Sequence, residues 1–146
     1  MAYSKYKGFY KPLKPEKWKG NINNIVFRSM LEYKFFRALE LNENVLEISS
    51  EEIIIPYVSP LDGKIHRYYP DLLLKVKTKN GKIKTYLCEI KPATETKPPR
   101  KTKRISESKY YKRVNTYLIN EAKWKYAKKY AEKNGWEFVI LTEKDL

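Results

Sequence analysis

Residues 68–92 read YYPDLLLKVKTKNGKIKTYLCEIKP and carry the clearest structural signal in the chain. Two apolar runs flank Asn80-Gly81, a dipeptide that favours a tight turn between antiparallel strands. We therefore predict a β-hairpin with one strand over about 65–76 and the other over about 82–90.

Two acidic residues interrupt the apolar runs of this hairpin. Asp71 precedes three leucines, and Glu89 lies between Cys88 and Ile90. Burying an ionised carboxylate costs several kcal/mol unless a positive group compensates it. Acids at these positions therefore point to a shared cation.

The turn decides whether these two acids can meet. With a three-residue loop over 79–81, in which Gly81 is left-handed, Asp71 faces Glu89 across the hairpin. With a two-residue loop, Asp71 faces residue 90 and the acids lie on opposite faces of the sheet. A shared site requires the first register.

A helix is predicted upstream of the hairpin, over 25–41. Asn23 and Asn24 are both suitable as its N-cap. Glu32 falls inside the apolar arc of this helix at about 100° per residue, which makes it a third acid on a core-facing position.

The remaining elements follow in chain order. They are a strand over 45–57 with an interruption near Ser49 and Ser50, a turn at Asp62-Gly63, a loop over 92–104, a helix over 106–134 that is continuous or divided near Asn120, a helix-ending glycine at Gly135, and a strand over 137–141. The order helix, three strands, helix, strand predicts an α/β fold, a small mixed β-sheet flanked by helices.

Charge is concentrated on two segments of the chain. The net charge is +14, and residues 97–133 hold 13 basic and 3 acidic groups. Such blocks attract polyanions such as nucleic acid, and a solubilising surface or one that contacts acidic protein is the alternative. The predicted DNA-binding residues are Lys97, Arg100, Lys101, Lys103, Arg104, Lys109, Lys112 and Arg113.

We predict a basic N-terminal arm over 1–24 and a single folded domain over 25–146. The arm is rich in Lys, Tyr and Pro and has no regular period. Its tyrosines Tyr3, Tyr6 and Tyr10 either pack onto the domain or stack on unpaired bases.

Composition excludes other classes of protein. A single cysteine, Cys88, rules out an internal disulfide and reads as a core residue. No apolar run approaches the roughly 20 residues of a membrane-spanning helix, and no apolar signal core follows Met1. We expect a soluble intracellular protein that does not act at a membrane.

Lys91 adds a catalytic group to the acids, because residues two apart on a strand share a face. We assign Glu32, Asp71, Glu89 and Lys91 as catalytic. Asp71 and Glu89 would bind a metal together with the backbone carbonyl of Ile90, and Glu32 would bind it directly or through water. Lys91 would orient the attacking water. Hard oxygen ligands favour Mg²⁺, with Mn²⁺ as a substitute.

A simpler interpretation treats each acid separately. Asp71 would cap a turn, Glu89 would pair with Lys91, and Glu32 would pair with Arg28. Three further residues remain open as contributors to the site: His66, Glu51 and Glu52.

With Pro70-Asp71, Glu89-Ile90-Lys91 and Glu32 in place, the chain resembles the PD-(D/E)XK nuclease superfamily. The resemblance implies a restriction-endonuclease-like core in which the aspartate and glutamate bind metal and the lysine serves catalysis. A glutamate on the first helix often completes that site.

A second resemblance covers nearly the whole chain, to the head-completion nucleases of large tailed bacteriophages. It is carried by Lys19-Gly20-Asn21, Arg28-Ser29, Ser50-Glu51-Glu52, Pro56-Tyr57, Ser59-Pro60-Leu61-Asp62, His66-Arg67-Tyr68, Glu89-Ile90-Lys91-Pro92, Ala122-Lys123-Trp124 and Gly135-Trp136-Glu137-Phe138. It implies trimming or sealing of packaged DNA, with DNA and the head, portal or neck proteins as partners, in the host cytoplasm or the virion.

Two rival functions remain open. One is a transposase endonuclease subunit or junction resolvase with the same core. The other is a virion structural protein that binds DNA without cutting it. A homodimer would let a single-site nuclease cut both strands.

Overall fold

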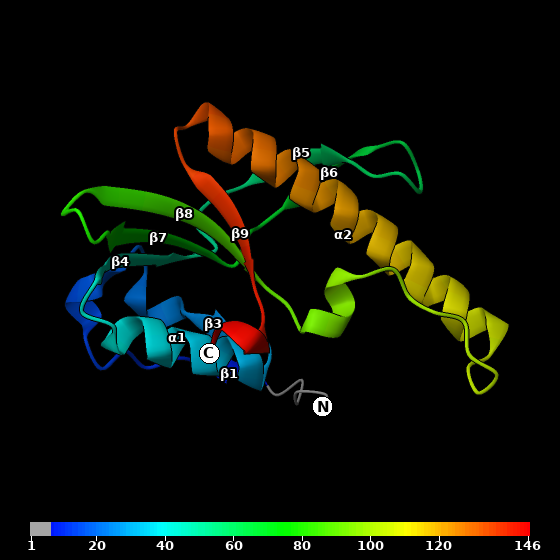
Figure 1. Ribbon diagram of the computed structural model, residues 1–146, viewed down its shortest axis with the longest axis horizontal. Coiled ribbons are helices and arrows are strands. Elements are labelled where there is room, and N and C mark those ends of the chain that lie inside the picture. Colours follow the sequence, from blue (N-terminus) through cyan, green and yellow to red (C-terminus); the bar gives the residue numbers. More distant parts are fainter. Residues whose placement is uncertain (1–6) are drawn as a thin grey trace.

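The computed structural model describes residues 7–146. A five-stranded mixed sheet lies between two helices, α1 (Met30–Leu41) and α2 (Glu107–Lys133), which cover opposite faces (Figure 1). In spatial order its strands are β2 (Trp18–Lys19), β4 (Val45–Ser50), β7 (Leu72–Lys77), β8 (Ile83–Ile90) and β9 (Glu137–Leu141). The predicted α/β class is confirmed.

Shorter elements surround this sheet. They are the pair β1 (Gly8–Phe9) and β3 (Val26–Phe27), the pair β5 (Ile55–Val58) and β6 (Ile65–Tyr68), and the 3₁₀ turns η1 (Pro15–Lys17), η2 (Ile22–Asn24), η3 (Ala93–Thr96) and η4 (Glu143–Asp145).

The turn between β7 and β8 is the three-residue form that a shared acidic site requires. Gly81 has a φ of 77°, and its N–H donates to the Thr78 carbonyl at 2.9 Å. The Thr78 N–H donates to the Lys82 carbonyl at 2.8 Å, which closes the loop. Leu72 is consequently paired with Cys88, so the residues next to them, 71 and 89, are level at the end of the ladder.

Two predicted strands are each divided in the structure. The strand over 45–57 breaks at Glu51, whose φ of 53° is left-handed and turns the chain out of the sheet. The strand over 65–76 breaks at Pro70, which cannot donate to a neighbouring strand. β5 and β6, the parts of these two predicted strands that lie outside the five-stranded sheet, pair with each other and pack against α2.

The predicted start of the first helix at residue 25 is wrong. The helix begins at Met30, because Ser29 is its N-cap and accepts a hydrogen bond from the Glu32 N–H at 3.1 Å. The Glu32 carboxylate reaches back to the Arg28 N–H at 3.3 Å, which gives a capping-box arrangement one residue early. Phe27 is instead extended and buried in the core.

The long second helix is continuous. Asn120 is buried inside α2 and caps nothing, so the option of two helices is wrong. Gly135 ends the helix as predicted, with a φ of 73° and its N–H donating to the Glu132 carbonyl at 3.1 Å. β9 has the predicted bounds.

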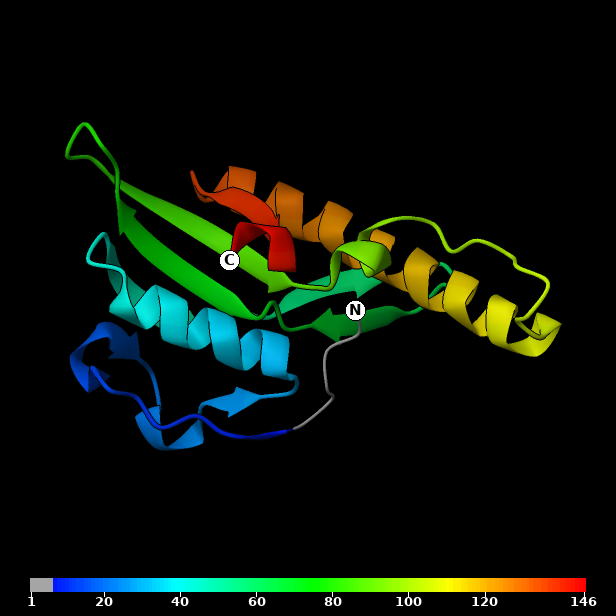
Figure 2. The same cartoon turned by 60° about the horizontal axis from the view of Figure 1, so that its bottom comes forward.

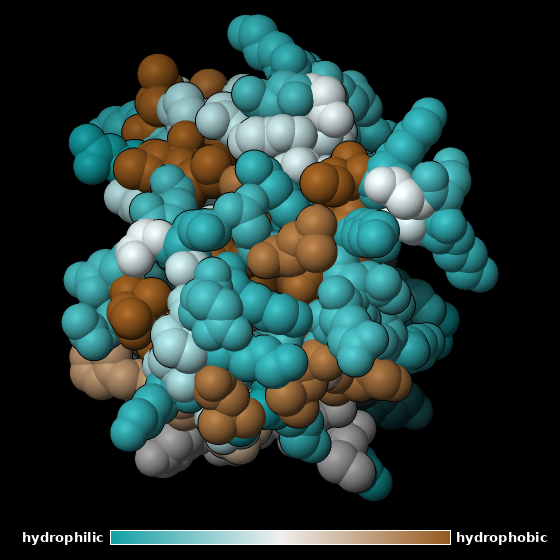
Figure 3. All heavy atoms as spheres, turned by 90° about the vertical axis from the view of Figure 1, so that its left-hand side faces the viewer, coloured by the Kyte–Doolittle hydropathy of each residue, from teal (hydrophilic) through white to brown (hydrophobic). Residues whose placement is uncertain are grey.

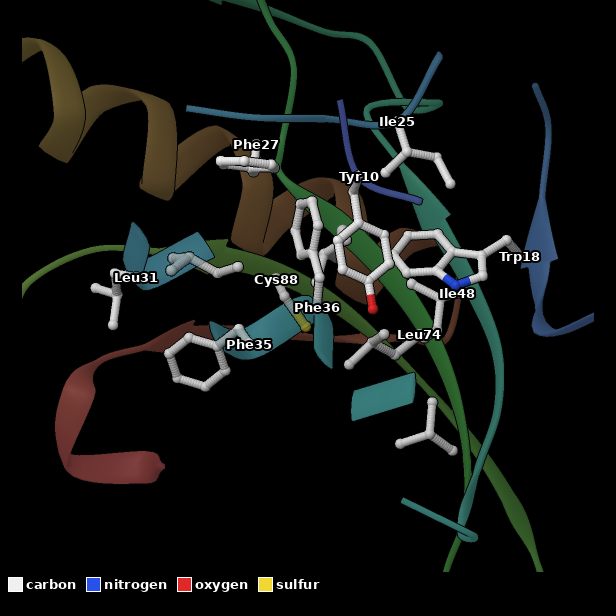
Figure 4. Packing of buried hydrophobic residues seen from close by; sticks show 13 residues of the cluster. Tyr10, Trp18, Ile25, Phe27, Leu31, Phe35, Phe36, Ile48, Leu74 and Cys88 are labelled. Carbon is white, nitrogen blue, oxygen red and sulfur yellow. The ribbon is translucent and has the colours of Figure 1, made fainter. Parts of the chain in front are cut away.

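The core on the α1 side of the sheet is built around aromatic rings (Figure 4). The Tyr10 ring lies between Phe36 and Trp18, with centroid distances of 5.6 Å and 5.4 Å. Cys88 belongs to the same cluster and is buried, as predicted.

One buried acid in this core escaped the sequence analysis. Glu40 on α1 is 0% exposed, and its carboxylate accepts from the Tyr10 hydroxyl at 2.6 Å and the Trp18 indole N–H at 2.7 Å. The backbone N–H groups of Lys14 and Leu13 donate to it at 3.0 Å and 3.2 Å. Burial opposes ionisation, but these four donors outweigh it and hold the pKa of Glu40 below its ordinary value.

The described part of the N-terminal arm, 7–24, runs along α1 (Figure 2). Tyr10 is 2% exposed, so the prediction that it packs onto the domain is confirmed, and the alternative that it stacks on unpaired bases is wrong. Tyr3 and Tyr6 lie outside the described residues. The division of the chain at residue 24 stays a prediction.

A second cluster fills the space between the sheet and α2. Ala127 and Ala131 on α2 are fully buried against Leu87 of β8 and the tyrosines Tyr57 and Tyr68 of the β5–β6 hairpin. Small side chains let the helix approach the sheet closely. This second cluster positions the cleft described below.

The surface at the end of the molecule opposite the free end of α2 is mainly hydrophilic, with small separate apolar patches (Figure 3). Within residues 7–146, no helix has the length and apolar character needed to cross a membrane.

Replacing Glu40 by Gln tests the polar anchor in the core. We expect Glu40→Gln to lose about 2–4 kcal/mol of unfolding free energy at pH 7, because an amide has one acceptor oxygen for four donors. A carboxylate with a lowered folded-state pKa stabilises the fold above its unfolded value of 4.5, and that contribution is lost as the pH falls through its folded pKa. Urea unfolding of both proteins from pH 8 to pH 3 should show a constant difference that shrinks below about pH 4.5. A difference that grows in acid would contradict this role.

Candidate active site

A cleft opens at the end of the sheet where β7 begins and β8 ends, beneath the base of the β5–β6 hairpin. Its volume is about 440 Å³. We call it the acidic cleft, and it is lined by Arg28, Glu51, Arg67, Tyr68, Tyr69, Asp71, Glu89 and Lys123.

The hairpin register brings two carboxylates to one face of the sheet. Leu73 and Leu87 are paired, and both belong to the cluster on the α2 side. Side chains alternate along a strand, so Asp71 and Glu89 also point to the α2 side. Both line the acidic cleft.

Asp71 is held by the neighbouring strand. Its carboxylate accepts from the Ile90 N–H at 2.7 Å, while its own carbonyl accepts from the Glu51 N–H at 3.2 Å. Burial raises the pKa of Asp71 well above its ordinary value, and repulsion from Glu89 and Glu32 adds to the shift. An ionised Asp71 therefore calls for a cation.

Glu89 is 8% exposed and accepts a hydrogen bond from the Tyr68 hydroxyl at 2.5 Å. Burial raises its pKa, against the opposing effects of that hydrogen bond and of the positive charges of Lys91 and Lys123. Burial together with the charge of Glu89 also raises the pKa of Tyr68, so this hydroxyl stays a donor.

Glu32 approaches from the other side of the sheet, at the N-terminus of α1. Its carboxylate accepts from the Arg28 N–H and from the Ser29 hydroxyl, each at 3.3 Å. Burial raises the pKa of Glu32 in spite of these contacts. Its charge is felt at both Asp71 and Glu89, so the three predicted acids form one electrostatic group.

Lys91 follows the last residue of β8. Its N–H donates to the Leu141 carbonyl of β9 at 3.0 Å, which fixes the backbone. The positive charge of Lys91 lowers the pKa of both Asp71 and Glu89. Within residues 7–146 it makes no ion pair with either acid inside 4.0 Å, so the pairing of Glu89 with Lys91 is not formed.

The donor set suits a divalent cation. Buried carboxylates that repel one another, with raised pKa values, are relieved by a positive ion. In the described range 7–146, no three His, Cys, Asp or Glu side chains stand close enough to form a ready metal cluster. Asp71 and Glu89, which both line the acidic cleft, are hard oxygen donors of the kind that divalent cations accept together with water.

The other simple pairings are replaced by different contacts. Arg28 forms an ion pair with Glu51 at the rim of the acidic cleft, not with Glu32. Glu52 packs its side chain against Gly20, where a Cβ atom would lie 2.0 Å from Oε1. His66 pairs with Asp62 at 2.8 Å on the exposed hairpin.

Lys123 of α2 is one of the cleft residues to which the sequence analysis assigned no role. Its ammonium lies over the rings of Tyr57 and Tyr68, 5.8 Å and 5.6 Å from their centroids. Burial lowers its pKa, partly offset by attraction to Glu89. Its spacing of four residues from the buried Ala127 was the available signal, because a lysine interrupts the packed face there.

The predicted DNA-binding residues lie on the loop after η3 and on the N-terminal half of α2, the helix that contributes Lys123 to the cleft. All eight are exposed, and Lys101 forms an ion pair with Glu107 at 3.3 Å. This half of α2 projects beyond the sheet with the basic loop alongside (Figures 1 and 2). The buried residues of α2 all lie from Asn120 onward.

Two comparisons place the chain among known proteins. Residues 42–143 match the family described as TnsA-like endonuclease N terminal. The chain is also 35% identical over 149 residues to the head completion nuclease of Enterobacteria phage T4, with coverage of 100% of this chain and 95% of that protein. The resemblances inferred from the motifs are thereby confirmed, and the chain belongs to the TnsA-like endonuclease family of PD-(D/E)XK-type nucleases.

Proposed function

We propose that this protein is a metal-dependent DNA endonuclease that acts in the completion of phage heads. The observation that carries the proposal is the pair of buried carboxylates, Asp71 and Glu89, that line one cleft, with the charges of Glu32 and Lys91 acting on both. The similarity to the T4 head completion nuclease supports the biological setting.

Asp71 and Glu89 would hold the metal, with the Ile90 carbonyl as a further ligand and Glu32 acting through water. When bound, a divalent ion supplies charge neutralisation at the phosphodiester and an acidified water. We propose Mg²⁺, with Mn²⁺ as a substitute, because all the ligands are hard oxygens.

Lys91 would act on the water and the phosphate. Lys91 lies two residues after Glu89, and its ammonium forms no ion pair with the acids, so it could donate to the attacking water and to the phosphate oxygen that gains charge. Tyr68 keeps Glu89 oriented through its hydroxyl. Asp71 is oriented by the Ile90 N–H.

The basic loop and the free half of α2 would bind the DNA backbone. Their cations are exposed, and contacts of this kind position a duplex without reading its sequence. Three acidic and three basic side chains line the cleft, so the exposed cations outside it would attract the DNA backbone toward the site.

The match over residues 42–143 favours a second candidate within the enzymes, a transposase endonuclease subunit or junction resolvase with the same core. A preference for branched DNA or transposon ends over linear duplex would select it. A structural virion protein that binds DNA without cutting is the outcome if no nuclease activity is found.

We propose DNA and phage head, portal or neck proteins as partners, and the host cytoplasm or virion as location. A homodimer would place two sites on the two strands. The ratio of linear to nicked plasmid early in the reaction separates paired from single cuts.

Plasmid cleavage tests the catalytic assignment. We expect the wild-type protein to nick or linearise supercoiled plasmid in Mg²⁺ or Mn²⁺ and to be inactive in EDTA. Lys91→Ala, Asp71→Asn and Glu89→Gln should each lower the rate about 10²–10⁴-fold, because each removes a group at the reacting phosphate. Lys82→Ala, in the distant β7–β8 turn, is the matched control. If the wild-type protein left the plasmid intact in both metals, the proposal that it is an endonuclease would be refuted.

Metal binding can be measured without any DNA. In EDTA we expect Asp71→Asn to be more stable than wild type, because it removes a buried repelling charge. Saturating Mg²⁺ at about 100 times its Kd should stabilise the wild type by about 2.7 kcal/mol and leave Asp71→Asn unchanged. Thermal unfolding with and without the metal reports both effects, with the exposed Glu132→Gln as control. If Mg²⁺ stabilised Asp71→Asn as much as it stabilises the wild type, Asp71 would be ruled out as a ligand.

The salt dependence of DNA binding tests the basic surface. About six phosphate contacts predict a slope of about −5 for log affinity against log salt, and removing four cations should reduce it to about −2. Anisotropy of a labelled duplex in EDTA measures the slope. The test variant replaces by Gln the residues Lys101, Lys103, Lys109 and Lys112. The control variant replaces by Gln the residues Lys77, Lys79, Lys82 and Lys133. Equal slopes for the two variants would place the DNA elsewhere.

A further inference from the structure

We propose that Lys123 of α2 is a second active-site lysine, which binds the scissile phosphate in the acidic cleft that Asp71 and Glu89 also line. The inference rests on the proposed nuclease function and names a residue of α2 for the reaction.

The position of Lys123 is unusual for a lysine. It lies one helical turn before Ala127 and two turns before Ala131, both of them fully buried against the sheet. Packing alone would favour another small or apolar residue here. The helix instead presents a cation at the point where it leaves the sheet and borders the cleft.

The surroundings of Lys123 hold its stem and leave its ammonium available. The faces of Tyr57 and Tyr68 attract the charge at 5.8 Å and 5.6 Å. Among residues 7–146, Lys123 makes no ion pair inside 4.0 Å, although Glu89 and Asp71 attract it electrostatically. An ammonium has three N–H donors, and here they remain free for a ligand.

The ligand expected in such a place is a phosphate oxygen. Once a divalent ion has neutralised Asp71 and Glu89, the lysine is no longer needed to balance them, and the cleft carries positive charge toward the substrate. Lys91 directly follows β8, the strand that carries Glu89, whereas Lys123 comes from α2. Two lysines on separate elements can therefore contact different oxygens of one phosphodiester.

The same helix face continues outward to the proposed DNA-binding surface. Going back along α2 from Lys123, steps of seven, four and three residues lead to Thr116, Lys112 and Lys109. These spacings keep the three residues near one side of the helix. At 1.5 Å per residue, Lys109 lies about 21 Å from Lys123 along the axis. A DNA backbone lying along this side of α2 would meet Lys123 at the cleft.

The alternative is that Lys123 only offsets the buried charge of Glu89. Both roles predict some loss of stability when the charge is removed in EDTA, so stability alone cannot separate them. A phosphate contact also predicts changes in the cleavage rate and in the salt dependence of DNA affinity.

The test compares Lys123→Met, which keeps the apolar stem, with Lys123→Arg and with Lys125→Met, an exposed lysine on the same helix. At saturating DNA in Mg²⁺, we expect the single-turnover cleavage rate to fall about 10²-fold in Lys123→Met, with Lys123→Arg retaining part of the activity and the Lys125→Met control unchanged. Should Lys123→Met fail to fold, Lys123→Gln replaces it.

DNA affinity is the second readout, measured in a Lys91→Ala background in Mg²⁺. Adding Lys123→Met should lower the magnitude of the salt slope by about one, as expected for one lost phosphate contact, and Lys125→Met should not. A rate and a slope equal to those of the control would overturn the proposal, whatever the melting temperature does. If the wild type does not cleave at all, the nuclease function fails separately, and the slope alone decides whether Lys123 binds phosphate.

Discussion

Repulsion between buried carboxylates is the constraint on which this molecule is organised. Asp71, Glu89 and Glu32 come from three elements, and each raises the cost of ionising the others. A fold selected for stability alone would have placed apolar groups here. The structure accepts the cost and surrounds the acids with oriented donors, the Ile90 N–H and the Tyr68 hydroxyl, which fix the carboxylates without neutralising them.

Glu40, a buried acid away from the cleft, shows that enough hydrogen-bond donors keep the pKa of a buried carboxylate low. Glu40 is as deeply buried as any residue of the core, yet four hydrogen bonds keep its pKa low. Its donors come from the N-terminal segment, and its own helix carries Glu32 at the other end. Glu40 therefore ties the chain before α1 to the helix that contributes to the cleft. The same residue type serves structure at position 40 and, in the proposed function, metal binding at position 89.

The sequence analysis was most successful where local chemistry decides the structure. The Asn80-Gly81 turn and the apolar runs around it predicted the hairpin and left two registers open, and the structure has the one that brings residues 71 and 89 level. The start of α1 was misplaced because Ser29 and Glu32 form a cap that competes with the upstream asparagines. Glu32 was predicted as a metal ligand, and its carboxylate also accepts hydrogen bonds at the start of α1.

What the sequence could not reveal depends on contacts between distant segments. The donors of Glu40 lie 22 to 30 residues away, and no short pattern records them. Lys123 meets Tyr57 and Tyr68 only after α2 has packed onto the β5–β6 hairpin. Asp71 and Glu89 could be singled out in the sequence because an acid within an apolar strand pattern is itself informative, whereas the opposite wall of the cleft is assembled by tertiary structure.

The break at Glu51 has an architectural consequence. The Glu51 N–H donates to the Asp71 carbonyl, so the chain leaves the sheet after β4 and returns to it at β7 through two points that touch. The segment between these two points, which includes the β5–β6 hairpin, lies outside the sheet. The geometry of the sheet therefore does not fix the length of this segment. Relatives could lengthen or shorten the outer turn of this segment, beyond Tyr57 and Tyr68, without shifting the acids at its base, which would let one nuclease core carry different attachments.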